Sequence, residues 1–90
     1  MKNKREQALV ALKKAQTHLA NVVKMTMDGK YCINIMQQNL AVMGLLRSAH
    51  QLLMEYHLNS CFINAMGTAS RSKKDKMIRE ILTVAKFLNK

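Results

Sequence analysis

The sequence predicts an all-α protein of three helices with a long central helix. Three features indicate this class: the 90-residue chain has no Pro and only three Gly, 49% of its residues are apolar, and the apolar residues recur at three- and four-residue steps. Such a composition favours long uninterrupted helices over strands and turns. Ninety residues form one small domain, here residues 1–90, whose own core is only marginally large.

The first helix is expected from about Lys4 to Met27. Mostly apolar residues mark one face at three- and four-residue steps: Leu9, Leu12, Ala15, Leu19, Val22, Val23 and Thr26. Asp28 and Gly29 predict its end, because Gly tolerates the left-handed conformation of a C-terminal cap. A short turn there would fold the second helix back antiparallel to the first.

The second helix is expected from about Tyr31 to Met66, which is roughly 54 Å at the standard rise. Its apolar residues are too widely distributed for a single seam: Ile33, Ile35, Met36, Leu40, Val42, Met43, Leu45, Leu46, Leu52, Leu53, Met54, Leu58, Phe62 and Ile63. A helix that is apolar on most of its circumference is buried on most of it. We therefore predict that two second helices pack antiparallel in a four-helix-bundle dimer, and that two dimers associate as a homotetramer.

Residues 67–72 are expected to form a loop, with Ser70 or Ser72 capping a short third helix that extends to about Asn89. The apolar stripe of this helix comprises Ile78, Ile81, Leu82, Ala85 and Leu88. Its outer face is basic and carries Lys73, Lys74, Lys76, Arg79 and Lys86. Glu80 lies among these cations, and taken alone it is most simply one half of a solvated surface pair.

Fifteen Lys and Arg against five Asp and Glu give the chain a formal net charge of +10. A field of this sign attracts polyanions, and nucleic acid is favoured over an anionic membrane surface. The alternative is that basic faces only keep the bundle in solution. The sequence shows no signal peptide and no apolar run of transmembrane length, and two Cys do not make a secreted disulfide framework. We therefore expect a cytoplasmic protein without a membrane partner.

Cys32, His57 and Cys61 form a set of two thiols and one imidazole in a chain that is otherwise poor in metal ligands. On a helix, His57 and Cys61 share one face, with Cβ atoms about 5–6 Å apart. Cys32 lies 25 positions before His57, too far along one helix, but antiparallel pairing would bring Cys32 of one subunit to the other two ligands of its partner. Soft thiolates with one imidazole suit Cu(I) best and Zn(II) next. Each Cys taken alone is more often a small buried core residue than a ligand, and only the spacing and the third residue make the two interpretations about equal.

The segments Tyr31-Cys32-Ile33, Ala41-Val42 and 53–62 resemble the copper-sensitive operon repressor family, CsoR, and the resemblance extends over about residues 9–88. It implies an all-helical dimer of dimers that binds operator DNA without a helix-turn-helix and releases it when an inducer binds between subunits. It also implies that the Cu(I) ligands are Cys32, His57 and Cys61. Tyr31 and Glu80 match positions beside the ligands that couple the metal to DNA release.

Within this family, the ligand set favours Cu(I) as the inducer. Sulfur-sensing relatives lack the histidine at position 57, nickel or cobalt sensors add one near the N-terminus, and formaldehyde sensors have an N-terminal proline and lack the second cysteine. His18 matches a histidine of several members and could extend the coordination for Ni(II), although a single His on this helix is more often structural. The alternatives are a family member that senses nickel, formaldehyde or sulfur species, and a basic architectural nucleic-acid-binding protein.

The DNA-contacting residues differ from those of the family. Copper-sensing members usually have Arg at the positions of Ala11 and Ser48. We expect DNA contacts from other basic side chains of the first two helices, namely Arg5, Lys13, Lys14 and Arg47. A Lys does not grip phosphate or guanine with two parallel bonds as a guanidinium does, so operator preference can differ. Catalysis is not expected, because the sequence has no close carboxylate pair and no Gly-rich phosphate loop.

Overall fold

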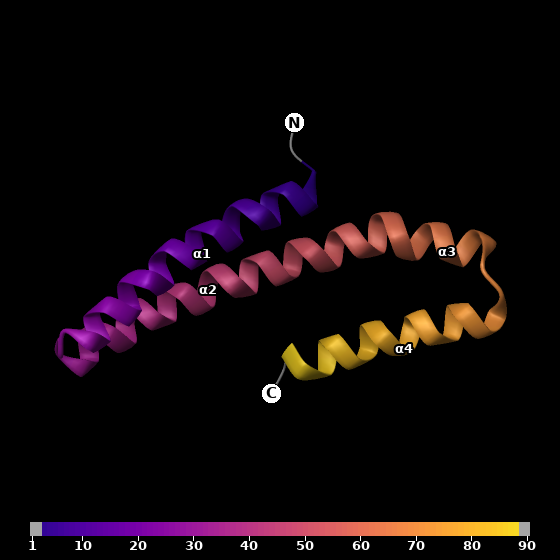
Figure 1. Cartoon of the computed structure of the whole chain (residues 1–90). Coiled ribbons are helices and arrows are strands. Elements are labelled where there is room, and N and C mark those ends of the chain that lie inside the picture. Colours follow the sequence, from indigo (N-terminus) through magenta and orange to yellow (C-terminus); the bar gives the residue numbers. More distant parts are fainter. Residues whose placement is uncertain (1–2, 89–90) are drawn as a thin grey trace. The chain divides into compact units, whose positions relative to one another are not determined.

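The computed structural model describes residues 3–88 of the chain, and these residues are almost entirely helical (Figure 1). The elements are α1 (Lys4–Met27), α2 (Cys32–His57), the π-helix η1 (Leu58–Phe62), α3 (Ile63–Thr68) and α4 (Arg71–Leu88). The described range contains no strand, which confirms the all-α class. The contacts divide the chain into two units, one ending at Tyr56 and the other beginning at His57. The prediction of a single domain stays a prediction.

Helix α1 has the predicted bounds, and local hydrogen bonds define both ends. At its start, Oδ1 of Asn3 accepts a bond from the Glu6 amide at 2.8 Å, which satisfies one of the unpaired amides of the first turn. At its end, the Asp28 amide donates to the Lys24 carbonyl at 2.9 Å. Gly29 follows with a φ of 67°. This left-handed conformation is the one that Gly was predicted to supply.

The two helices α1 and α2 form an antiparallel hairpin (Figure 1), and the side chains buried between them form a seam. The residues buried in this unit recur every seven positions on each helix: Ala8, Ala15 and Val22 on α1, and Val42 and Ala49 on α2. Ile35 and Leu45 pack against the part of the seam formed by Ala15, Val22 and Val42. Seven-residue spacing is the pattern of helices that pack at a shallow angle, and the small side chains let the backbones approach closely.

The predicted apolar face of α1 was only partly right. Ala15 and Val22 are buried, but Leu9, Leu19 and Val23 remain 51%, 45% and 49% exposed, and Ala8 belongs to the seam although it was not predicted. The reason is that helical spacing identifies an apolar face without showing which part of it packs inside one chain. Here the small residues pack on α2, and the large ones lie outside the hairpin.

The predicted central helix is present as a helical run from Cys32 to Thr68, but it changes register within its length. The five residues Leu58–Phe62 form a π-turn between α2 and α3. Tyr31 lies just before the run, and its carbonyl accepts from the amides of Asn34 and Ile35 at 3.0 and 3.2 Å. The sequence contained no signal for the π-turn. Such turns are rare in proteins, but many of those that occur lie at functional sites.

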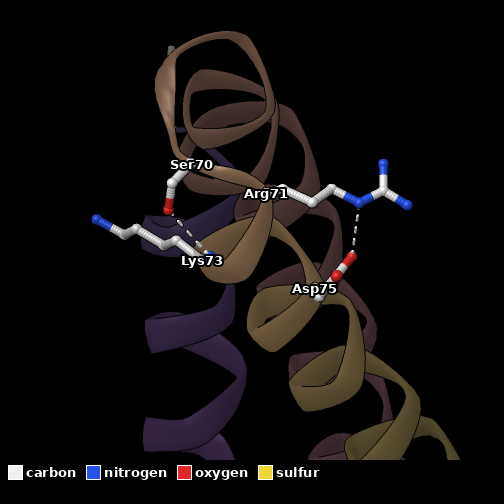
Figure 2. Close-up of polar contacts among 4 residues, drawn as sticks. All are labelled: Ser70, Arg71, Lys73 and Asp75. Atoms are coloured by element: carbon white, nitrogen blue, oxygen red, sulfur yellow. Dashed lines mark hydrogen bonds and ion pairs between the residues drawn. The ribbon is translucent and has the colours of Figure 1, made fainter.

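Helix α4 begins with two side-chain contacts (Figure 2). Oγ of Ser70 accepts from the Lys73 amide at 3.3 Å, so Ser70 is the cap and Ser72 lies inside the helix. Nε of Arg71 lies 3.4 Å from Oδ1 of Asp75, a pair that is largely exposed. The connection to α3 is only residues 69–70, shorter than the predicted loop of 67–72, because α3 extends through Thr68. The predicted end at Asn89 lies outside the described residues.

Much apolar surface remains uncovered on every long helix. The exposed large side chains include Met36, Leu40 and Met43 on α2 at 58%, 63% and 50%, and Leu82 and Phe87 on α4 at 63% each. No large side chain in the described part of the chain is fully buried. Within residues 3–88, no helix combines the length and the apolar character that crossing a membrane requires.

Candidate metal centre

The first thiol of the candidate metal centre lies at the start of α2. Cys32 is the first residue of that helix, and its side chain is exposed and free. Tyr31 precedes it and is 70% exposed. An exposed thiol at a helix start is accessible to a metal ion and to other subunits. Within a single chain, Cys32 is therefore not part of the core, and its role as a metal ligand stays a prediction.

The imidazole and the second thiol lie at the junction between α2 and the π-turn. His57 is the last residue of α2 and is half-buried, and Cys61 is an exposed, free cysteine within η1. In an α-helix, four residues pass slightly beyond one turn of 3.6. The π-turn is wider, since its hydrogen bonds span five residues, so four steps fall just short of a full turn. In either register, His57 and Cys61 share one face.

Cys32 and His57 occupy opposite ends of the same helix. They are the first and last residues of a 26-residue α-helix, which separates them by about 38 Å. In the described part of one chain, no three His, Cys, Asp or Glu side chains cluster as a metal requires. The donor chemistry, two free thiols and one imidazole, fits a soft metal ion. Because a helix of this length holds its two ends apart, a site containing all three needs Cys32 from one copy of the chain and the other two from another.

The two other residues predicted to support the site lie on different helices. Nε2 of His18 on α1 is hydrogen-bonded to Oε1 of Gln38 on α2 at 2.6 Å. This bond links the two helices of the hairpin and favours the structural role of His18. Glu80 is an exposed residue of α4. Its predicted role in coupling the metal site to DNA release stays a prediction.

The predicted DNA-contacting residues are exposed, and two of them border a shallow hollow on α1. The hollow has a volume of about 620 Å³ and is lined by Val10, Lys13, Lys14, Thr17, His18 and Asn21. Arg47 is exposed on α2. Arg5 is also exposed, but its guanidinium lies over the ring of Tyr56, with Cζ 5.9 Å from the ring centroid.

A pair of contacts that the sequence did not predict joins the first turn of α1 to the last turn of α2. Nζ of Lys4 lies 3.3 Å from Oε2 of Glu55. Next to this ion pair, the guanidinium of Arg5 lies over the ring of Tyr56. These contacts join residues 51 positions apart in both cases, so no local spacing could have indicated them. Their partners on α2 directly precede His57.

Comparison with known proteins decides the family. Residues 4–86 match the family described as metal-sensitive transcriptional repressors. The chain belongs to this family. It is 31% identical over 85 residues to the copper-sensing transcriptional repressor CsoR of Mycobacterium ulcerans, a match that covers 94% of this chain and 70% of that relative. It is 35% identical over 63 residues to CsoR of Mycobacterium tuberculosis H37Rv, which covers 70% of this chain and about half (53%) of the relative.

The metal-sensitive repressor fold is also seen in a solved structure. The structure of CsoR with Cu(I) from Geobacillus thermodenitrificans NG80-2 matches with a TM-score of 0.80 at 30% identity, over 100% of this chain and 91% of that one. These matches confirm the resemblance drawn from the cysteine and histidine pattern and the all-α fold. The relatives are transcriptional repressors rather than enzymes, which agrees with the absence of catalytic motifs noted in the sequence.

Proposed function

We propose that this chain is a transcriptional repressor that binds operator DNA in its metal-free form and releases the DNA on binding Cu(I). The observation that supports this most is the combination of a soft donor set with a backbone that matches Cu(I)-bound CsoR over the whole chain. Thiolates and an imidazole suit Cu(I), an ion that is stable in a reducing compartment. The two free cysteines agree with such a compartment, and we place the protein in the cytoplasm.

In this proposal, the ligands of each site come from two subunits. Cys32 of one subunit and His57 and Cys61 of the partner subunit bind the ion, and an antiparallel dimer contains two equivalent sites. Both cysteines bind as thiolates, so binding displaces about two thiol protons. Glu80 supplies a carboxylate and Tyr31 a hydroxyl, groups of the kind that orient a ligating imidazole through its second ring nitrogen.

The exposed apolar residues support the subunit pairing that this site needs. Leu40, Met43 and Leu53 of α2 lie outside the seam with α1 and are 63%, 50% and 41% exposed. Their burial in a second copy would remove a large apolar surface from water, at about 25 cal/mol for each Å². A closed symmetric assembly covers the same surface on each copy. We infer a homodimer, and a homotetramer formed from two dimers.

Sedimentation at micromolar concentration tests this assembly. We expect a species with two or four times the chain mass of 10.3 kDa, with the tetramer as the main form. The physical reason is that a single hairpin buries only small side chains and leaves its large ones in water. A folded monomer under these conditions would contradict the assembly and remove the shared metal site with it.

Operator binding is assigned to the basic residues of α1 and α2. Lys13, Lys14, Arg47 and Arg5 are exposed, and the net charge of each chain is +10. Phosphate contacts of this kind supply most of the affinity and make it fall steeply with salt. Charge neutralisation is too small to explain release. A monovalent cation that replaces two thiol protons changes the charge by about one unit per site. The release must therefore come from a change in helix geometry.

A titration of DNA-bound protein tests the whole proposal. An operator sequence is first selected from a pool of random DNA duplexes by their binding to the metal-free protein. The affinity of the protein for this operator is then measured in the presence of Cu(I), Zn(II), Ni(II) or formaldehyde. We expect Cu(I) to weaken binding about 5- to 150-fold, the range of typical coupling free energies. Release by one of the others instead would identify a different inducer. An affinity that none of them changes would leave a basic nucleic-acid-binding protein, and the repressor proposal would fail.

A further inference from the structure

The first turn of α1 is attached to the last turn of α2 by two contacts outside the hairpin seam. One is the Lys4 to Glu55 ion pair of 3.3 Å, and the other is the Arg5 guanidinium 5.9 Å from the centre of the Tyr56 ring. We call these two contacts the clamp. The last buried residue of α1 on this side is Ala8, so the seam itself does not extend to Lys4 and Arg5.

The clamp lies between the two functional surfaces of the chain. Tyr56 directly precedes His57, the proposed imidazole ligand. Arg5 is one of the four basic residues assigned to operator binding. Tyr56 therefore contacts Arg5, a proposed DNA-binding residue, through its ring. It is also the sequence neighbour of His57, the proposed metal ligand.

We infer that the clamp couples metal binding to DNA release, and this inference rests on the proposed function. When His57 and Cys61 share a metal ion with Cys32 of the partner subunit, the last turn of α2 must adjust to the ligand geometry. Tyr56 and Glu55 belong to that turn and are held to Arg5 and Lys4. The first turn of α1 then follows, and its cations leave the positions that suit the phosphates. Tyr56 is thus a positioning residue.

Energetic considerations support a modest role for each contact and a larger one for the pair. Both side chains of the ion pair are about half exposed, at 49% and 51%, and such pairs contribute little alone. A cation over an aromatic face is attracted by the ring quadrupole, and at an exposed site this contact is modest as well. Two contacts on adjacent residues fix both the distance and the relative orientation of the first turn of α1 and the last turn of α2. The clamp can therefore transmit a rotation of α2 that one contact would not.

Comparing Tyr56→Leu with Tyr56→Phe tests this coupling. Leucine keeps an apolar side chain but removes the aromatic face, whereas phenylalanine keeps the face and removes only the hydroxyl. For each variant, the ratio of operator dissociation constants with and without Cu(I) is measured, together with the Cu(I) affinity of the DNA-free protein. We expect the ratio to fall about two- to fivefold for Tyr56→Leu and to stay at the wild-type value for Tyr56→Phe. The Cu(I) affinity should be unchanged in both.

A second variant keeps the inference testable if Tyr56→Leu folds poorly, which circular dichroism would show. Glu55→Gln removes the ion pair at constant volume, and we expect it to lower the same ratio by less than Tyr56→Leu does. Wild-type ratios in both variants would overturn the inference. Loss of Cu(I) binding by DNA-free Tyr56→Leu would also overturn it, because the residue would then act in the site itself. If wild type shows no copper effect, the proposed function fails and the coupling role fails with it.

Discussion

Cys32→Ser is expected to abolish tight Cu(I) binding as severely as Cys61→Ser does. Each substitution removes one of two thiolates from a three-ligand site, and a serine hydroxyl is a hard, protonated replacement that a soft ion does not favour. The result is notable because Cys32 lies at the far end of α2 from the other two ligands. Competition with a Cu(I) chelator measures the affinity. His18→Gln is the matched control and should bind normally, because His18 is paired with Gln38.

Mixing two inactive variants distinguishes a shared site from a site within one chain. A subunit with Cys32→Ser keeps His57 and Cys61, and a subunit with Cys61→Ser keeps Cys32. When the two are unfolded together and refolded at equal amounts, random pairing makes half of the dimers mixed, and each mixed dimer regains one intact site. We expect about a quarter of the wild-type Cu(I) capacity. No recovery, or full affinity in Cys32→Ser alone, would contradict the shared geometry and return Cys32 to a structural role.

The ends of α1 could be predicted because they depend on local chemistry. Many helices end at a residue with a left-handed φ, and Gly29, directly after Asp28, adopts this conformation at the end of α1. The cap of α4 was local in the same way, although the sequence could not choose between two serines. Ser70 accepts the bond because α3 continues through Thr68 and leaves only two residues for the connection.

The seam and the π-turn could not be predicted, for two different reasons. Leu9 and Ala8 are adjacent and both apolar, so periodicity cannot say which of them faces α2 inside one chain and which stays available to another. The π-turn needs no particular residue type, because it is a change in backbone hydrogen-bond register. Both features depend on packing between elements distant in sequence.

The sequence supports the candidate site only through residue types and spacing. The four-residue step from His57 to Cys61 is a property of one helix, and their shared face follows from it. The meeting of Cys32 with these two depends on how two copies of α2 pair, and it stays a prediction. The clamp was not predictable, since Arg5 and Tyr56 come together only through the hairpin.

His57→Ala is expected to separate metal binding from DNA release. The variant keeps both thiolates, which suffice to hold some Cu(I), and it keeps the basic residues of α1, so it should still bind operator in the metal-free form. It loses the ligand that belongs to the last turn of α2. Without the imidazole, a bound ion no longer fixes the position of that turn, and the geometric change that weakens DNA binding is largely lost.

Operator affinity of His57→Ala, measured with and without saturating Cu(I), checks this. We expect the copper effect to fall about tenfold or more, or to vanish if the wild-type effect is smaller than that. Occupancy must be measured in the same samples, so that weak binding is not mistaken for lost coupling. Full release by a Cu(I)-loaded variant would show that the thiolates alone drive the change, and Cys61 within the π-turn would then be the ligand that moves the helix. Because a charge effect would be the same in variant and wild type at equal occupancy, a difference between them can only come from geometry.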